Sequence, residues 1–189
     1  AESNYLKVVE DCAQAHGAIY KGHSVGSIGH IGAWSFCQDK IMTIGGEGGM
    51  VTTNNEDLWK KIWSYRDHGK KFEPNFNLKS QLKSRSRNNS SYQWTNDSFG
   101  TNWRLTEMQS ALGCFQIKKM PEWSRKRRAN CQRISEACKI FPAIRLPEVP
   151  DYIDHACYKH YVFLRSDKLK QGWNQSRIID EINKLKVPC

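Results

Sequence analysis

Four polar residues near the start of the chain have side chains that could bind and react with a small molecule. Asp11 directly follows Val8, Val9 and Glu10, and Gln14 comes three residues later. Ser35 and Lys40 are five positions apart and precede a glycine-rich turn, Gly-Glu-Gly-Gly. A carboxylate can pair with a cation, a hydroxyl can donate to a phosphate, and a lysine amine can attack a carbonyl carbon. We interpret these residues as one candidate site.

Glycines are dense around these polar residues. They are Gly17, Gly22, Gly26, Gly29, Gly32, Gly45 and Gly46. Such density indicates backbone that lies close to a ligand or adopts left-handed conformations, and it is not typical of a plain core.

Each candidate also has an ordinary interpretation. Asp11 could cap a helix, Gln14 could belong to a turn, Ser35 to a strand and Lys40 to the surface. Their joint spacing favours a pyridoxal phosphate (PLP) site. There a lysine forms a Schiff base with the cofactor aldehyde, a carboxylate keeps the pyridine nitrogen protonated, and hydroxyls and small residues hold the phosphate.

The elements that would position these residues are typical of an α/β protein. We expect a buried strand over Leu6–Glu10, which would place Asp11 at a carboxyl end of a sheet, where α/β proteins bind ligands. Further strands are expected over Ala33–Cys37 and Met50–Thr53, with a loop over Ile19–Gly32 between the first two.

The rest of the chain is mainly helical. Expected helices cover Glu56–Arg66 (capped by Asn54 or Asn55), Thr106–Met120 (capped by Thr106 and ended or kinked at Pro121), Glu122–Ile140 and Ser176–Leu185. In the last of these we expect Ile178, Ile179, Ile182 and Leu185 to face inward. A strand is expected over Tyr158–Leu164. The stretch Phe72–Phe99 has no period and reads as a long loop, either a disordered surface loop or an insertion that contacts substrate or partner.

Composition narrows the class of protein. The 189 residues include seven cysteines, an odd number without a Cys-x-x-Cys pair. This pattern favours reduced thiols in a cytoplasmic protein over disulfides or a zinc site, and no metal is expected. We see no signal peptide and no apolar run long enough for a membrane span.

The net charge of +10 raises the question of nucleic-acid binding. Much of the excess falls in two groups: Lys70, Lys71, Lys79, Lys83, Arg85 and Arg87 in the polar loop, and Arg125–Arg128 on one helix. A solvated face or loop is the favoured interpretation, a role in binding small phosphate-bearing molecules is second, and nucleic acid is disfavoured.

Five segments, in order, carry a resemblance to a known family. They are EDCAQAHGA, GSIGHIGAWSF, Lys40 followed by MTIGGEGGM, RDHG, and FGTNWRLTEMQSALG. The chain resembles the DegT/DnrJ/EryC1/StrS family of sugar aminotransferases over nearly its whole length. These are fold-type I PLP enzymes that act on nucleotide-linked keto-sugars.

The resemblance implies roles for individual residues. Lys40 would be the Schiff-base lysine, Asp11 the partner of the pyridine nitrogen, and Gln14 a neighbour of the cofactor ring. Ser35 would bind the cofactor phosphate, and Asn102 would reach the phosphate of a neighbouring subunit's cofactor in a homodimer. The resemblance also implies that Glu47–Gly49 shape the turn after the lysine. Arg66 and His68 match a family motif, and we interpret them as structural.

The resemblance further implies a domain organisation. Residues 1–150 would form part of the large PLP-binding domain, a mostly parallel mixed sheet with helices on both faces. Residues 151–189 would begin a small α+β domain. Relatives carry earlier strands, a second phosphate-binding segment and an aromatic that covers the ring, all before the position of Asp11.

The implied reaction transfers an amino group, usually from glutamate, to a nucleotide-linked keto-sugar in amino-sugar or cell-surface polysaccharide synthesis. Two alternatives stay open. One is a non-catalytic fragment or interaction module that keeps the fold. The other is a PLP-dependent sugar dehydratase, whose histidine in place of the lysine makes Lys40 an argument against it.

Overall fold

The chain forms two compact units in a computed structural model that describes residues 1–72 and 96–187. The first unit comprises Ala1–Ala13 and Gly26–Gln116, and the second comprises Gln14–Val25 and Ile117–Cys189. The expected insertion over Phe72–Phe99 lies largely outside the described residues. The predicted domain boundary near Asp151 stays a prediction.

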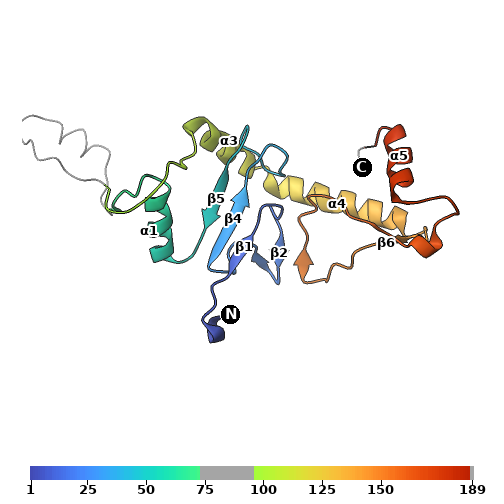
Figure 1. Ribbon diagram of the computed structural model, residues 1–189, viewed down its shortest axis with the longest axis horizontal. Coiled ribbons are helices and arrows are strands. Elements are labelled where there is room, and N and C mark those ends of the chain that lie inside the picture. The colour runs from blue at the N-terminus through green and yellow to red at the C-terminus, as the bar shows by residue number, and fades with distance from the viewer. Residues whose placement is uncertain (73–95, 188–189) are drawn as a thin grey trace, which may run out of the picture. The chain divides into compact units, whose positions relative to one another are not determined.

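A three-stranded sheet forms the centre of the first unit. Its strands are β1 (Val9–Asp11), β4 (Ile31–Ser35) and β5 (Gly49–Thr52), in the order β1-β4-β5 (Figure 1). β1 runs parallel to β4, and β5 runs antiparallel to it. The mixed α/β class is therefore confirmed, with a sheet that is partly parallel. A short 3-10 helix, η1 (Glu2–Asn4), precedes the sheet.

Two helices complete the first unit. Helix α1 (Glu56–Tyr65) begins where the Asn55 side chain accepts the Leu58 N–H at 2.9 Å, so Asn55 is the cap. Helix α3 (Glu107–Ile117) begins after Thr106, whose hydroxyl accepts the Gln109 N–H at 3.2 Å as expected.

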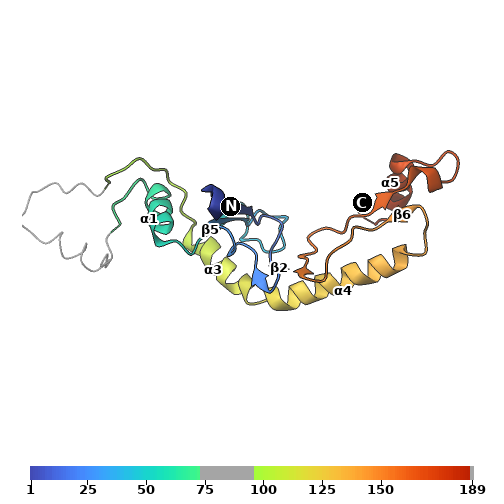
Figure 2. The same cartoon turned by 90° about the horizontal axis from the view of Figure 1, so that it is seen from below.

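The second unit contains helix α4 (Met120–Cys138), which Figure 2 shows as one continuous helix. The helix expected over Thr106–Met120 ends at Ile117, and α4 begins at Met120, so the helix is interrupted just before Pro121. Pro121 itself lies in the first turn of α4, where its missing N–H costs nothing. Around α4 are short elements: β2 (Ile19–Tyr20), β3 (His23–Ser24), β6 (Ile144–Arg145), β7 (Ile153–Asp154), β8 (Phe163–Leu164), η2 (Ser166–Lys168) and α5 (Gln175–Lys184). β2 pairs antiparallel with both β3 and β7, and β6 pairs antiparallel with β8.

Several boundaries differ from the expected ones. The strand over Leu6–Glu10 is not buried: β1 starts at Val9, and Leu6 is 59% exposed. The loop over Ile19–Gly32 contains the hairpin of β2 and β3. Of the strand expected over Tyr158–Leu164, only β8 forms. Leu185 is 77% exposed, so its inward position was wrong.

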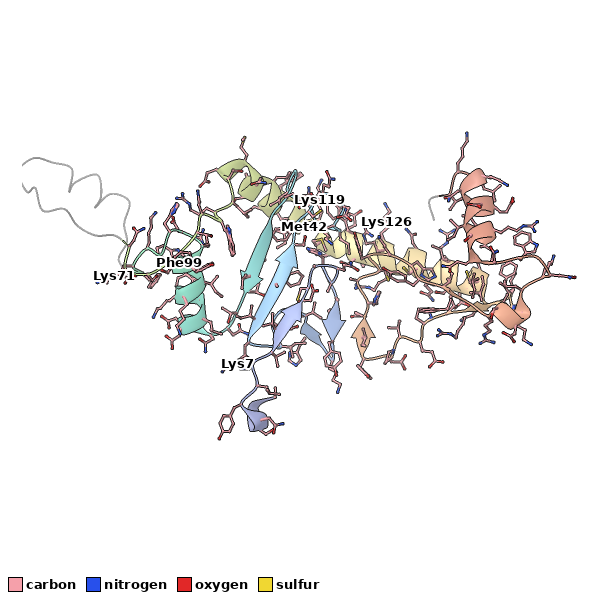
Figure 3. The ribbon with its side chains drawn as sticks, in the orientation of Figure 1. Lys7, Met42, Lys71, Phe99, Lys119 and Lys126 are labelled. Atoms are coloured by element: carbon pink, nitrogen blue, oxygen red, sulfur yellow. The ribbon has the colours of Figure 1, made fainter. Side chains whose placement is uncertain are left out.

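Part of the positive charge on α4 stabilises its own unit. Arg127 donates to the carbonyls of Cys157 and Tyr158 at 3.3 and 3.4 Å, and Arg128 donates to that of Gly17 at 3.4 Å. These guanidinium groups satisfy loop carbonyls that no strand pairs with. Lys126, on the same helix, is labelled in Figure 3.

Within the described ranges, no helix is both long and apolar enough to cross a membrane. The six described cysteines are free thiols, and no cluster of metal-ligating side chains occurs among the residues with known positions.

Candidate active site

The two faces of the β1-β4-β5 sheet carry different kinds of residue. Asp11 pairs with Ala33, and Ser35 pairs with Gly49. Paired residues share a face, and side chains two apart on one strand also share it. Asp11, Ala33 and Ser35 therefore lie on one face, at the carboxyl end of the parallel pair. Ala33 lies between the two polar side chains on this face, and Gly49 lies beside Ser35. Neither residue has a bulky side chain there.

The opposite face is covered by the loop that starts at Gly26. Glu10 pairs with Gly32 and so points away from Asp11's face. Its carboxylate accepts three backbone N–H groups, from Gly26 at 2.7 Å, Ile28 at 2.8 Å and Gly29 at 2.6 Å. Glu10 therefore holds the glycine loop against β1 and β4.

These bonds also set the charge state of Glu10. Partial burial would raise the pKa of its carboxyl, but the N–H groups of Gly29, Gly26 and Ile28 together outweigh burial and lower the pKa below its ordinary value. The carboxylate stays charged at neutral pH and acts as a fixed anchor.

Close packing on the same face explains two of the glycines. A Cβ on Gly32 would lie 2.6 Å from the Gly26 Cα, so any other residue would push the loop away. Thr52 donates its hydroxyl to the Gly26 carbonyl at 2.7 Å and accepts the indole N–H of Trp34 at 3.0 Å. The glycine pattern thus serves backbone packing behind the sheet at these positions.

Asp11 and Ser35 make local hydrogen bonds that fix their direction. One Asp11 carboxylate oxygen accepts the Ala13 N–H at 3.0 Å, and the residue is exposed. Ser35 accepts the Cys37 N–H at 3.3 Å. Because the serine oxygen is the acceptor in that bond, its own proton remains to be donated to a ligand.

Lys40 lies in the turn that follows β4 and is half-buried. The backbone N–H of Lys40 donates to the Cys37 carbonyl at 3.0 Å. The turn is anchored by the residues after it, since Ile41, Met42 and Ile44 are at most 6% exposed.

Helix α3 supports this anchored segment. The Thr43 N–H donates to the Gln116 side chain at 3.2 Å, and Gln109 donates to the Glu47 carbonyl at 3.0 Å. Gly113 brings the helix close, since a Cβ there would lie 3.3 Å from Ile44. Met42, labelled in Figure 3, belongs to the same contact. The LTEMQSALG sequence therefore supports the lysine turn.

The remaining two predicted residues lie elsewhere. Gln14 is exposed and falls in the second unit. Asn102 is exposed on the segment before α3, within the first unit, and pairs with Asp67 in an isolated antiparallel bridge. The structure thus brings Asp11 and Ser35 onto one face and places Lys40 in the next turn. The roles of all five residues stay predictions.

The RDHG segment holds the backbone around Asn102. The His68 N–H donates to the Thr101 carbonyl at 2.8 Å, and the Trp103 N–H donates to the Arg66 carbonyl at 2.9 Å. Gly69 has φ +70°, and a Cβ there would clash with the Ser98 backbone. Arg66 and His68 act here through their backbone, in keeping with the structural interpretation.

Two residues that stabilise the structure were not among the predicted ones. Glu10 anchors the glycine loop. Because side chains alternate along a strand, its position next to Asp11 indicated that it would point to the opposite face of the sheet. Asp67 is 7% exposed and lies within the ion-pair distance of Lys70 and Arg104. Nothing in the sequence near Asp67 indicated that it would be buried.

The donor set fits pyridoxal phosphate. Asp11 offers a carboxylate for a protonated ring nitrogen, Ser35 offers a hydroxyl proton for a phosphate, and Lys40 offers a primary amine for an aldehyde. Ala33 and Gly49, between and beside these groups, add no bulky side chain to this face. The chemistry of the residues therefore agrees with the cofactor that the sequence motifs imply.

Comparison with known proteins gives a consistent result. A model of the DegT/DnrJ/EryC1/StrS aminotransferase family matches residues 1–189. The chain is 30% identical to the dTDP-3-amino-3,6-dideoxy-alpha-D-galactopyranose transaminase of Aneurinibacillus thermoaerophilus, over 100% of the chain and 46% of that protein. It is also 30% identical to the UDP-N-acetyl-3-dehydro-alpha-D-glucosamine 3-aminotransferase of Acidithiobacillus ferrooxidans, over 96% of the chain and 44% of that protein.

A solved structure agrees over the full chain. The aminotransferase from Psychrobacter cryohalolentis is 53% identical, with a TM-score of 0.87, over 100% of this chain and 48% of that one. The chain thus spans less than half the length of the relatives that it matches.

Proposed function

This chain belongs to the DegT/DnrJ/EryC1/StrS aminotransferase family, and on that premise we propose that the whole protein is a PLP-dependent aminotransferase acting on a nucleotide-linked keto-sugar. The observation that carries the proposal is the shared face of Asp11 and Ser35, with Lys40 in the turn that follows β4. Relatives named as transaminases of dTDP- and UDP-linked sugars support the substrate class.

Each residue has a task that follows from its chemistry. When bound, PLP supplies an aldehyde that takes up an amino group and a ring that accepts electrons. Asp11 would face the ring nitrogen and hold its proton by charge pairing. Ser35 would donate its hydroxyl proton to a phosphate oxygen. Lys40 would attach the cofactor between turnovers, and its amine nitrogen would take and return the proton at the substrate carbon.

The proposal also covers the amino donor and the oligomeric state of the protein. Glutamate is the amino donor expected from the family resemblance, and Gln14 would lie beside the ring. Asn102 would serve the cofactor of a second subunit, so the working unit would be at least a homodimer. A lysine at position 40 also argues against the dehydratase alternative, in which the family resemblance implies a histidine.

Reductive trapping tests the proposal. The whole protein should absorb as a PLP enzyme, and borohydride should fix the cofactor on Lys40, as peptide mapping by mass spectrometry would record. Lys40→Arg is the matched control, because it keeps the charge but cannot form the bond. An adduct on Lys21 or Lys60, or no adduct, would contradict the assignment.

A further inference from the structure

The amide of Asn102 has a defined direction. Its carbonyl oxygen accepts the Nε–H of Arg104 at 3.0 Å. A guanidinium can only donate, so the oxygen end of the amide must face Arg104, and the NH₂ end must face away. The exposed side chain therefore presents its two donors, and a neighbouring positive charge, to whatever approaches it.

Arg104 is in turn held by Asp67. The Arg104 Nη1 lies 3.4 Å from the Asp67 Oδ1, while the Asp67 Oδ2 accepts the Lys70 ammonium at 3.1 Å. The longer contact is an ion pair without hydrogen-bond geometry, and Oδ1 accepts no hydrogen bond from any described residue. Asp67 is thus a buried carboxylate with a cation near each oxygen.

The backbone around these side chains is closely tied. Asp67 and Asn102 lie opposite each other, flanked by the two backbone hydrogen bonds between Arg66–His68 and Thr101–Trp103. Asp67, Arg104 and Asn102 therefore form a continuous series from a buried anion to an exposed amide. We call it the Asp67 relay.

Stability alone is a poor explanation for the Asp67 relay. Burying a carboxylate costs desolvation free energy, and a well-packed apolar residue at such a site is often as stable or more stable. A buried charge that directs an exposed donor has another use, since it fixes one orientation of Arg104 and hence of the amide.

We propose that Asp67 is a positioning residue, which through Arg104 turns the NH₂ donors of Asn102 toward the phosphate of a cofactor held by a second subunit. This inference rests on the proposed function, in which Asn102 reaches that phosphate. It adds that the acid of the RDHG segment contributes to cofactor affinity without touching the cofactor.

Asp67→Asn and Arg104→Met in the whole protein test the relay. Each should weaken PLP binding about tenfold, the effect of losing roughly one oriented charge-assisted hydrogen bond. Binding of pyridoxal, which lacks the phosphate, should change less than about twofold, because the Asp67 relay serves only the phosphate. The double variant should be no weaker than either single one.

Lys70→Met is the matched control. It removes the other cation from Asp67 but leaves the Arg104–Asn102 bond, so PLP affinity should stay within about twofold. Dissociation constants come from absorbance titration, and circular dichroism checks folding. If Asp67→Asn does not fold, the PLP and pyridoxal affinities of Arg104→Met test the relay.

Two results would overturn the relay while leaving the proposed function intact. One is an equal loss of affinity for PLP and pyridoxal in the variants, which would show a structural role. The other is unchanged PLP affinity in Asp67→Asn and Arg104→Met although Asn102→Ala weakens it. A wild-type protein that binds neither compound would instead overturn the proposed function, and the relay with it.

Discussion

Glu10 and Asp11 are adjacent acids on one strand, yet they point to opposite faces of the sheet and do different work. Glu10 is bound by three N–H groups and holds a loop in place. Asp11 accepts one N–H and keeps an oxygen for a ligand. Strand alternation alone accounts for this separation.

Asp11→Asn should separate cofactor binding from turnover. We expect the variant to retain the cofactor on Lys40, because the proposed bond to Lys40 and the proposed contact with Ser35 do not involve Asp11. Turnover should fall by about two to three orders of magnitude, because an uncharged amide no longer keeps the ring nitrogen protonated and the barrier rises by roughly 3–4 kcal/mol, at about 1.4 kcal/mol per factor of ten. Steady-state kinetics together with cofactor absorbance measure both quantities. Near-normal turnover would rule out the charge-pairing role of Asp11.

Glu10 should make stability depend on pH in the acid range. Its folded pKa lies below the unfolded value of 4.5, so its stabilisation is fully present above that value and is lost as pH falls through the folded pKa. Glu10→Gln should flatten this loss and lower the free energy of unfolding at neutral pH by about 1–3 kcal/mol. Urea unfolding at several pH values measures it.

The control for Glu10 is Glu136→Gln. Glu136 forms an exposed ion pair with Lys139 at 2.7 Å, which should contribute little. Equal effects from both substitutions would mean that the loop is not anchored by Glu10.

Among single residues, type and spacing suggested the candidate reactive side chains but not the residues that support them. Asp11, Ser35 and Lys40 were proposed in this way, and their roles stay predictions. Asp67 was not, because its burial depends on contacts with Lys70 and Arg104, and Arg104 is far from it along the chain.

Among the elements, α1 has a cap that can be tested directly. Asn55→Ala removes the acceptor for the Leu58 N–H and should lower the free energy of unfolding by about 1 kcal/mol. Asn55→Asp keeps an acceptor at the helix N-terminus and should retain most of that stability. Thermal unfolding of both variants measures the difference, and equal losses would show that the cap contributes nothing.

Helices were predicted to within a few residues because apolar period and caps are local signals. Short strands were not. β2 and β3 are two residues each, and their turn at Lys21-Gly22 has positive φ at both positions, which type I′ hairpins require. The partner of β2 on its other side, β7, is remote in sequence, so no local pattern could reveal that pairing.

For the whole molecule, the described surface carries many uncovered apolar side chains. Met108 is 83% exposed, Phe99 82%, Trp103 68% and Val9 64%. Such exposure is typical of surfaces that bind other protein. Under the proposed function, further residues of the whole protein or a second subunit would cover these side chains.

The 189-residue chain expressed alone should therefore associate, bind PLP weakly and lack transaminase activity. The whole protein should bind PLP and accept an amino group from glutamate. Sedimentation velocity, cofactor absorbance and the glutamate half-reaction compare the two. A monomeric and active 189-residue chain would show that the site needs nothing beyond these residues.

The contacts between residues 69–70 and 96–98 have a consequence for protein engineering. The Gly69 carbonyl accepts the N–H groups of Asp97 and Ser98, and Lys70 pairs with Asn96, so the two ends of the intervening segment are fastened together. The entropic cost of bringing two chain ends together grows slowly with the number of residues between them, by only about 0.6 kcal/mol for each doubling. Peptide tags or whole small domains could be spliced in between Lys71 and Asn96, and we expect the graft to leave Asn102 and the lysine turn undisturbed.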